Sequence, residues 1–239
     1  MNKIKIINDY KKIPKTFYGS SLVIGNFDGV HRGHKKVIEL ANKISKKNKS
    51  KLGIIMFAPH PKEYFSKEKQ FLLSSIETKS EILERLGVNF IIILKFNKNL
   101  ASMTALEFCN KILLNGCKMQ HIFIGKNFRF GNKRKGNIAL LKKLGKVHNY
   151  KVTDLTLARE KKIRISSTRV RRAIEKGNME LATLLLGRNW SIKEKVIPGR
   201  KIGRELGFRT ANIEIKKNIS PKTGVYVVKV RIKNNNYDG

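Results

Sequence analysis

Short apolar runs alternate with amphipathic helical patterns through the first three quarters of this chain. The apolar runs fall at 21–27, 52–57, 89–96 and 121–125, and a further strand is expected near 150–155. Four helical patterns lie between them. The first covers 34–47 and the last 137–145. The second runs from the capping-box pair Ser74 and Glu77 to Gly87, and the third runs from the similar pair Thr104 and Glu107 to Gly116. Apolar strands separated by helices predict an α/β fold in which helices cover both faces of a Rossmann-like parallel sheet.

The pattern changes near residue 187. From Trp190 onward, polar and apolar residues alternate between glycine-containing turns, and residues 224–232 (GVYVVKVRI) read as a strand. We expect a linker near 187–191 and then a β-rich domain. With about 50 residues, that second domain is too short for a closed barrel, so we expect an incomplete β-barrel.

The composition limits the function classes. The chain has 239 residues, with 52 Lys and Arg against 17 Asp and Glu, which gives a formal charge of +35. This charge indicates either a phosphate-rich partner or a genome-wide bias toward Lys, and the scatter of Lys along the chain favours the bias. Cys109 and Cys117 form no disulfide pattern, and no apolar run reaches membrane-spanning length. We therefore expect a cytoplasmic protein without a signal peptide.

The stretch VIGNFDGVHRGHKK, residues 23–36, carries the strongest signal of a site. His31 and His34 are three residues apart where a helical pattern begins, so both rings can face one side. Free N–H groups at a helix start attract anions, and Gly29 and Gly33 leave room for a ligand. A zinc site is the alternative, but no third and fourth ligand lie near in the sequence. We therefore expect a phosphate site here.

Two further loops, APHP (58–61) and GKNFRFG (125–131), also follow apolar runs. Ligands of parallel sheets bind beyond the carboxyl ends of the strands, so three loops should meet at one edge. A second phosphate-binding element is ISSTRVRRAIEKGN (165–178), where Ser166, Ser167 and Thr168 can cap a helix whose first turns are rich in Arg. No Walker A sequence occurs, so phosphates are held without a P-loop.

The four motifs GNFDGVHRGH, FAPHP, GKNFRFG and ISSTRVRRAIEKGN, in this order, resemble the adenylyltransferase module of bacterial FAD synthetases. Their H-x-G-H signature, here residues 31–34, belongs to the nucleotidylyltransferase superfamily. The tail GRELGFRTANIEI resembles the start of the riboflavin kinase module that usually follows. The resemblance implies an FMN adenylyltransferase domain over 1–187 and a truncated riboflavin kinase-like β-barrel over 188–239.

The implied reaction transfers AMP from ATP to FMN, giving FAD and pyrophosphate in the presence of Mg²⁺, without a covalent enzyme intermediate. Riboflavin would be the substrate of the kinase module. By match to the family motifs, the implied catalytic residues are His31, His34 and Arg169. The implied ATP-binding residues are Gly25, Asn26, Phe27, Asp28, Gly33, Ser167, Thr168 and Arg172. The implied flavin-binding residues are Phe57, His60, Pro61, Asn127 and Phe128, while Phe128 and Phe130 could equally be core aromatics.

The chain departs from the family pattern at three positions. Ala58 and Lys126 stand where acidic residues are common, which affects the flavin side. Arg209 replaces the proline of the kinase signature, although Thr210 and Asn212, the implied Mg²⁺ and phosphate ligands of the kinase, are present. The family's catalytic kinase glutamate lies beyond the last residue given, so we expect no kinase activity from this chain.

Two alternatives remain at this point. One is a sister nucleotidylyltransferase acting on another phosphorylated cofactor precursor. The other is a basic nucleic-acid-binding protein with a vestigial nucleotide site, which would need clustered basic residues and exposed aromatics on one face. The adenylyltransferase hypothesis instead predicts nucleotides and flavins as partners, with no nucleic acid and no membrane. The sequence does not indicate an oligomeric state.

Overall fold

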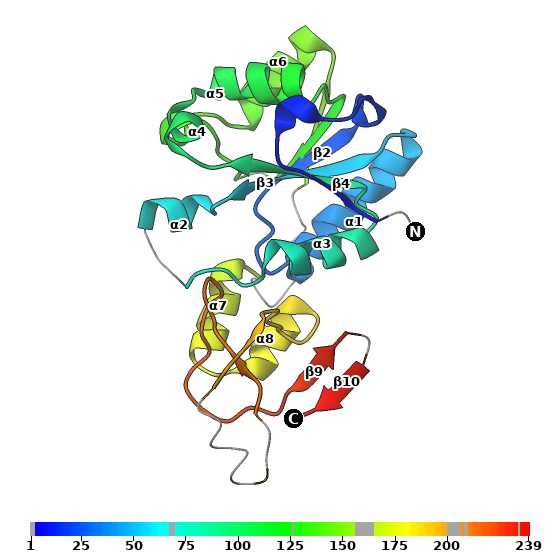
Figure 1. Cartoon of the computed structure of the whole chain (residues 1–239). Coiled ribbons are helices and arrows are strands. Elements are labelled where there is room, and N and C mark those ends of the chain that lie inside the picture. The colour runs from blue at the N-terminus through cyan, green and yellow to red at the C-terminus, as the bar shows by residue number, and fades with distance from the viewer. Residues whose placement is uncertain are drawn as a thin grey trace.

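The fold is built on a six-stranded parallel sheet with the strand order β1-β4-β3-β2-β5-β6 (Figure 1). The computed structural model describes residues 3–66, 70–125, 127–155, 165–199, 207, 210–233 and 235–239. The sheet strands are β1 (Lys5–Ile7), β2 (Ser21–Ile24), β3 (Leu52–Ala58), β4 (Phe90–Lys95), β5 (His121–Ile124) and β6 (Lys151–Asp154). The longer helices are α1 (Arg32–Lys47), α3 (Ile76–Arg85), α6 (Ile138–His148), α7 (Ser167–Glu175) and α8 (Met179–Leu186). Shorter ones are η1 (Tyr10–Lys12), η2 (Lys15–Phe17), α2 (Pro61–Ser66), α4 (Lys98–Ser102), α5 (Ala105–Glu107), the π-helical η3 (Phe108–Gly116) and η4 (Asn132–Arg134).

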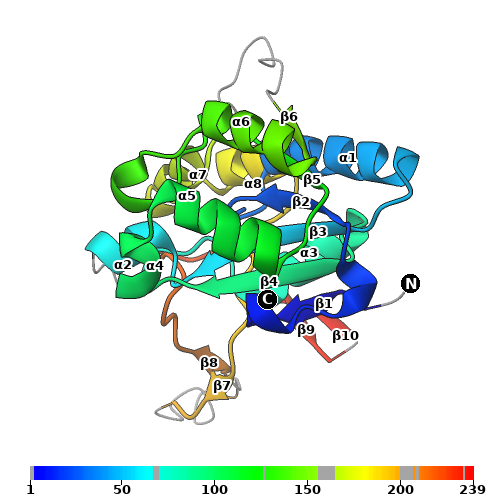
Figure 2. The ribbon, with the colours of Figure 1, turned by 90° about the horizontal axis from the view of Figure 1, so that it is seen from above.

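Helices cover both faces of the sheet, as predicted (Figures 1 and 2). Alternate residues of each central strand belong to two different hydrophobic clusters, so that Leu22 packs on one side and Val23 on the other. Helices α5, η3 and α6 cover one face, and α1 and α3 cover the opposite face. This two-sided burial explains why the strands are apolar throughout.

The chain crosses the sheet between β4 and β5, and this crossing positions the site. From β2, the strands β3 and β4 are added in turn on one side of the sheet, whereas β5 pairs with the other side of β2. The carboxyl ends of β2, β3 and β5 are therefore neighbours, and each is followed by one of the three expected loops. The prediction that these loops meet at one edge of the sheet is confirmed.

A third cluster lies below the sheet in Figure 1, around α7 and α8. Its members come from distant parts of the sequence, because Leu73 and Ile219 pack against apolar residues of both helices. The indole Nε1 of Trp190 donates a hydrogen bond to the Leu73 carbonyl oxygen at 2.9 Å. The segment expected to be a linker near 187–191 thus begins with residues in contact with the first domain. The domain division at 187/188 stays a prediction.

Residues 217–219 pair with residues 71–72 through the backbone. The N–H groups of Phe71 and Leu72 donate to the Lys217 carbonyl oxygen at 3.0 and 2.9 Å, and the Ile219 N–H donates to the Leu72 carbonyl oxygen at 2.8 Å. The C-terminal part is therefore tied to the loop 70–74 that precedes α3.

Helix starts follow the expected capping chemistry in most places. Thr104 and Glu107 form the predicted capping box, and Ser166 caps α7. The pair Ser74 and Glu77 was the wrong choice for α3, because Ser75 is the N-cap and its side chain accepts from the Thr78 N–H. Two elements had no clear sequence signal, namely β1, whose exposed Lys5 and Ile6 break the apolar pattern, and the short helix α2.

The C-terminal part forms two separate two-stranded sheets, which pair β7 (Val196–Ile197) with β8 (Asn212–Ile213) and β9 (Lys229–Ile232) with β10 (Asn235–Asp238). The strand predicted over 224–232 is shorter in the structure, because β9 covers 229–232 and only Val228 before it pairs, with Gly239. Val225 and Val227 are fully exposed, at 102% and 98%. Among the described residues these strands form no closed barrel, and the expected incomplete β-barrel stays a prediction. Lys126 and Arg209, two of the departures from the family pattern, lie outside the described residues.

Candidate active site

The loop between β2 and α1 has an unusual backbone. Phe27, Gly29 and Val30 have φ angles of 46°, 78° and 38°, in the left-handed region that is costly for residues other than glycine. A Cβ on Gly29 would lie 2.9 Å from Leu73 Cδ1, so packing fills the space that the sequence analysis had left for a ligand. Backbone of this kind persists only where surrounding contacts hold it, and such contacts are typical of functional sites.

The ends of β2 and β3 are tied together beside this loop. The Gly25 N–H donates to the Ile55 carbonyl oxygen at 3.1 Å, and Asn26 Oδ1 accepts from the Phe57 N–H at 3.4 Å. Both residues expected for ATP binding here therefore shape the loop. Gly33 is buried in the first turn of α1.

His31 and His34 lie with their rings stacked at the start of α1. The ring centroids are 3.6 Å apart and the planes differ by 14°, so the prediction that both rings face one side is confirmed. His31 is the N-cap of the helix, and its Nδ1 accepts from the His34 backbone N–H at 3.2 Å. Because Nδ1 is an acceptor, we infer that the neutral His31 ring carries its proton on Nε2. That N–H is then available to donate to a ligand.

Burial keeps both imidazoles uncharged at neutral pH. Burial lowers the pKa of His31 from 6.5 to about 4, and the charges of Arg188 and Arg171 act in the same direction. Burial also places the pKa of His34 well below its usual value, with a further contribution from Lys79. His34 Nδ1 is buried and has no hydrogen-bond partner among the described residues. The pair therefore offers the neutral Nε2–H of His31 to a ligand, while the buried Nδ1 of His34 is left unsatisfied.

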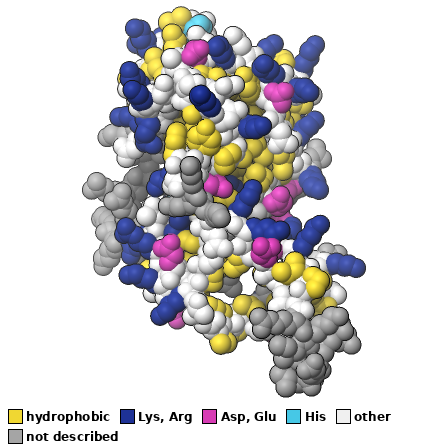
Figure 3. Space-filling model, turned by 60° about the vertical axis from the view of Figure 1, so that its left-hand side comes forward, with side chains coloured by type: hydrophobic (Ala, Val, Ile, Leu, Met, Phe, Trp, Pro, Cys, Tyr) yellow, Lys and Arg dark blue, Asp and Glu magenta, His cyan; other side chains and the backbone are white. Residues whose placement is uncertain are grey.

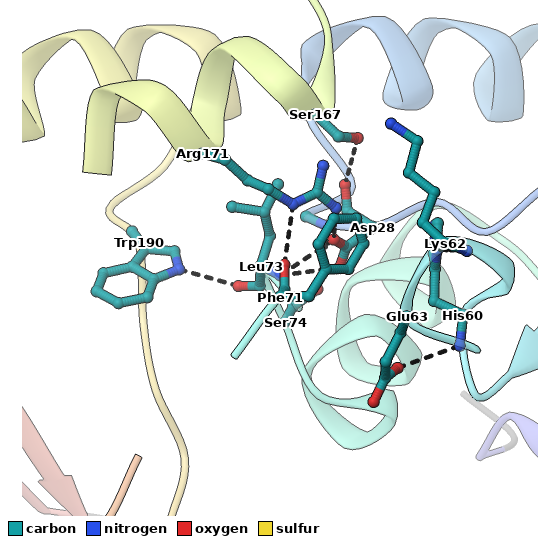
Figure 4. A network of polar contacts seen from close by, with 11 residues as sticks. Asp28, His60, Lys62, Glu63, Phe71, Leu73, Ser74, Ser167, Arg171 and Trp190 are labelled. Carbon is teal, nitrogen blue, oxygen red and sulfur yellow. Dashed lines mark hydrogen bonds and ion pairs between the residues drawn. The ribbon is translucent and has the colours of Figure 1, made fainter. Parts of the chain in front are cut away.

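A buried carboxylate, Asp28, anchors the loop from within (Figure 4). It is 2% exposed, accepts from the Leu73 N–H at 3.0 and 3.1 Å, and forms an ion pair with Arg171 of α7. Arg171 Nε also donates to the Phe71 carbonyl oxygen at 2.9 Å, and its guanidinium lies 3.7 Å from the Phe71 ring centroid. The Gly29 N–H donates to Ser74 Oγ at 3.1 Å. Loop 70–74 and α7 thus both bind the Asp28 carboxylate and fix its position.

Two further side chains bind the carbonyl oxygens of this loop. Ser167 Oγ donates to the Asp28 carbonyl oxygen at 3.0 Å, and Arg188 donates to that of Gly29 at 2.7 Å. Ser167 was expected to bind ATP, and in this structure its hydroxyl holds the loop. Arg188 was not singled out by the sequence analysis. An arginine just after a helix has no distinctive sequence context.

The other expected phosphate ligands on α7 differ in their exposure to solvent. Thr168 and Arg172 are exposed, and Arg169 is half-buried. Arg171 belongs to the arginine-rich helix start expected to bind phosphate but had been given no role of its own; it is 9% exposed and points to the loop. Neighbouring residues differ by 100° around a helix, so a run of arginines does not by itself reveal which one faces inward.

The loop after β3 presents His60 in a similar way to His31. His60 Nδ1 accepts from the Lys62 N–H at 3.1 Å, and the His60 N–H donates to Glu63 Oε2 at 3.2 Å (Figure 4). Burial, and then the charge of Arg171, lower the pKa of His60 to about 4. Pro61 begins α2. His60 therefore also presents a neutral Nε2–H.

Four aromatic side chains gather at the ends of β3 and β4. Phe57 packs edge-on against Phe96 at 6.0 Å, and Tyr64 and Phe65 of α2 pack against the same ring at 5.2 and 5.7 Å. Phe65 is 69% exposed. The sequence analysis found only Phe57, because the other three become neighbours through the sheet and α2.

The loop after β5 carries the remaining expected residues. Asn127 is exposed, and Phe128 is half-buried, with its ring 5.7 Å from that of Phe130. Phe130 is 6% exposed and packs on Phe108. The core alternative is thus confirmed for Phe130, while Phe128 lies between the core and the open edge.

Comparison with known proteins agrees with this geometry. The sequence matches the FAD synthetase family over residues 13–169 and the riboflavin kinase family over residues 186–239. The bifunctional riboflavin kinase/FMN adenylyltransferase of Buchnera aphidicola subsp. Schizaphis graminum is 42% identical over 229 residues, which cover 95% of this chain and 73% of the relative. The chain belongs to this bifunctional family. The Escherichia coli K12 member is 34% identical over 231 residues, covering 96% of this chain and 73% of that protein.

A solved structure shares the fold. A crystal structure named as a macrolide-efflux protein from Streptococcus pneumoniae has a TM-score of 0.82 and 30% identity, covering 99% of this chain and 77% of that chain. That name refers to the Streptococcus pneumoniae protein alone. In the described part of this chain, none of the helices has the length and apolar character needed to cross a bilayer.

Membership in the bifunctional riboflavin kinase/FMN adenylyltransferase family establishes the reaction class. The chain is a nucleotidyltransferase that makes FAD from ATP and FMN, and it carries residues of a riboflavin kinase domain. Thr210 and Asn212, expected to serve that kinase, are both exposed, and Asn212 lies in β8. Their role as ligands stays a prediction.

Proposed function

We propose that the β2–α1 loop and α7 bind the phosphates of ATP, and that the loop after β3 binds FMN beside them. The stacked His31 and His34 carry this proposal, because the pair lies at the positive end of α1 and His31 presents an Nε2–H there. Thr168, Arg169 and Arg172 would add donors from the start of α7.

The chemistry needs positioning more than a reactive side chain. The FMN phosphate attacks the α-phosphorus of ATP, a P–O bond to the FMN oxygen forms, and the bond to the leaving pyrophosphate breaks. His31 would donate its Nε2–H to a phosphate oxygen as negative charge shifts toward the pyrophosphate. The Asp28–Arg171 pair would hold the loop so that this donor keeps its place.

Mg²⁺ would reach the site with ATP. The buried carboxylate nearest the loop, Asp28, is already taken up by Arg171 and the Leu73 N–H. Among the described residues, no group of three or more His, Cys, Asp or Glu could hold a metal ion. The site therefore fits a cation bound by the ATP phosphates, where Mg²⁺ would offset their charge.

The aromatic cluster of Phe57, Tyr64, Phe65 and Phe96 supports flavin binding. A ring such as Phe65, which is 69% exposed and lies edge-on to Phe96, offers a face on which a flat isoalloxazine can stack. This assignment extends the expected flavin residues from Phe57 and His60 to α2.

A nucleic-acid partner is the second candidate, because of the high positive charge. On the face in Figure 3, Lys and Arg side chains are spread over the whole surface, with Asp and Glu among them. Nucleic-acid binding would need them gathered in a stripe or patch. Small nucleotides and flavins therefore remain the proposed partners. The buried free thiols of Cys109 and Cys117 support a reducing, cytoplasmic location.

The proposal is tested by supplying Mg²⁺-ATP to the chain with either FMN or riboflavin, and separating the products by chromatography. We expect FAD from FMN and no FMN from riboflavin. If riboflavin yields FMN, the expectation of an inactive kinase part is wrong. If neither product forms, and a His31→Asn variant binds ATP as well as the wild type does, the proposed site is wrong.

A further inference from the structure

Lys79 is a buried cation that the reaction described so far does not use. It lies in the first half of α3, and only 5% of its surface is exposed. Lysine is almost never this buried unless it is paired. Yet among the described residues its ammonium group makes no hydrogen bond and no ion pair, and it is not among the polar atoms that are fully buried without a partner, so it keeps some access to the site.

The side chain of Lys79 is directed from α3 toward the proposed phosphate site. Lys79 lies one turn after the N-cap Ser75, whose carbonyl oxygen accepts its N–H at 3.0 Å. Side chains on a helix lean toward its N-terminus, so Lys79 leans toward residues 73–75. There, Leu73 and Ser74 hold the loop that carries the two histidines.

The charges that act on Lys79 agree with this position. Burial lowers its pKa, while the carboxylates of Asp28, Glu63 and Glu77 act in the opposite direction. Its charge in turn contributes to the low pKa values of His34 and His60. The ammonium group thus lies near the junction between the proposed ATP side and the proposed flavin side.

None of the nearby carboxylates is free to neutralise it. Asp28 is paired with Arg171, and Glu63 accepts the His60 N–H. Glu77 is exposed to solvent. A largely buried cation that has no bonded counter-ion is costly, and an anion that enters the site lowers that cost.

We propose that Lys79 binds a phosphate oxygen at the point where the FMN phosphate meets the α-phosphate of ATP. This inference rests on the proposed function. Two phosphate groups must approach each other there, and a fixed cation between them offsets their repulsion. Both FMN and ATP carry the required chemistry, so the test separates them.

The test compares Lys79→Met, which keeps the length and removes the charge, with Lys79→Arg, which keeps the charge. Lys142→Met, an exposed lysine of α6, is the matched control. We expect Lys79→Met to raise the KM for FMN, for ATP or for both by about 10- to 100-fold, the range of one charged hydrogen bond. Lys79→Arg should recover part of this loss. The substrate whose KM changes more identifies the phosphate that Lys79 contacts.

A second readout separates this role from a structural one. FMN and AMP each carry one of the two phosphates that meet there, so each should raise the Tm of the wild type, and Lys79→Met should lose most of at least one of these shifts. The ligand-free Tm of Lys79→Met should equal or exceed that of the wild type, because a largely buried charge without a bonded counter-ion has been removed. The inference is overturned if Lys79→Met keeps the wild-type KM values and both shifts. If the wild type makes no FAD, the proposed function fails, whereas the FMN and AMP shifts still test Lys79.

Discussion

At the scale of single residues, the site depends on side chains with two duties. His31 is a proposed phosphate ligand and also the N-cap of α1, so its removal affects both catalysis and folding. The same holds for Ser167, a predicted ATP ligand whose hydroxyl holds the Asp28 carbonyl oxygen. Variants at such positions must preserve one duty in order to measure the other.

His31→Asn should separate the two duties of His31. Asparagine is a good N-cap, so helix stability should be kept, while the Nε2–H donor is lost. We expect kcat to fall by about 100- to 1,000-fold, the usual cost of one oxyanion donor. His31→Ala should show the same fall in kcat and lose a further ~1 kcal/mol of stability. FAD formation and urea unfolding measure the two effects, and an active His31→Asn enzyme would rule out the donor role.

The buried histidines should make stability depend on pH. The folded pKa of His31 and of His60 is about 4, below the unfolded value of 6.5, so the unfolded state binds more protons between these values. The free energy of unfolding should therefore fall as the pH drops below about 6.5, and this contribution should be constant above it. Denaturant unfolding at about pH 7.5 and about pH 5 measures it. His31→Asn should reduce the difference, and an unchanged difference would contradict this origin of the pH dependence.

At the scale of elements, α7 holds the β2–α1 loop through the Asp28–Arg171 ion pair and the Ser167 hydroxyl. Arg171→Met should leave the Asp28 carboxylate buried without a partner, at a cost of about 3–5 kcal/mol. The neighbouring Arg172→Met, on the exposed side of α7, should change stability by less than ~0.5 kcal/mol. Chemical denaturation compares the two. Asp28→Asn combined with Arg171→Met should recover part of the loss, and strictly additive costs would show that the two residues do not act as a pair.

The elements also show what a sequence can and cannot reveal. The apolar runs predicted β2 to β5, because strands buried on both faces have one composition throughout. The α3 start was displaced by one residue, because Ser74 and Ser75 are equally good caps and only the Gly29 contact takes Ser74 away. Lys79 lies in an ordinary polar pattern, and its burial depends on the packing of α3 beside a distant loop. Sequence patterns report local preference, whereas these features arise from contacts across the fold.

At the scale of the whole molecule, the part matched by the riboflavin kinase family supports the adenylyltransferase site. Ile219 is 4% exposed in the cluster of α7 and α8, and its N–H binds the Leu72 carbonyl oxygen. Ile219→Ala should cost about 2–5 kcal/mol of stability and lower FAD formation, although it lies far from the site in sequence. Val227→Ala, 98% exposed, is the matched control and should change neither. Equal behaviour of the two variants would contradict this support.

The pairing of residues 217–219 with 71–72 has a consequence for how such fused enzymes change over generations. A substitution on one side of this seam alters the support of a reaction performed on the other side. The sequences of the two parts therefore cannot change independently. A chimaera that joins the N-terminal part of one species' enzyme to the C-terminal part of another's should need compatible residues at this pairing in order to be active. Fusion in one chain has thus coupled the evolution of the two parts.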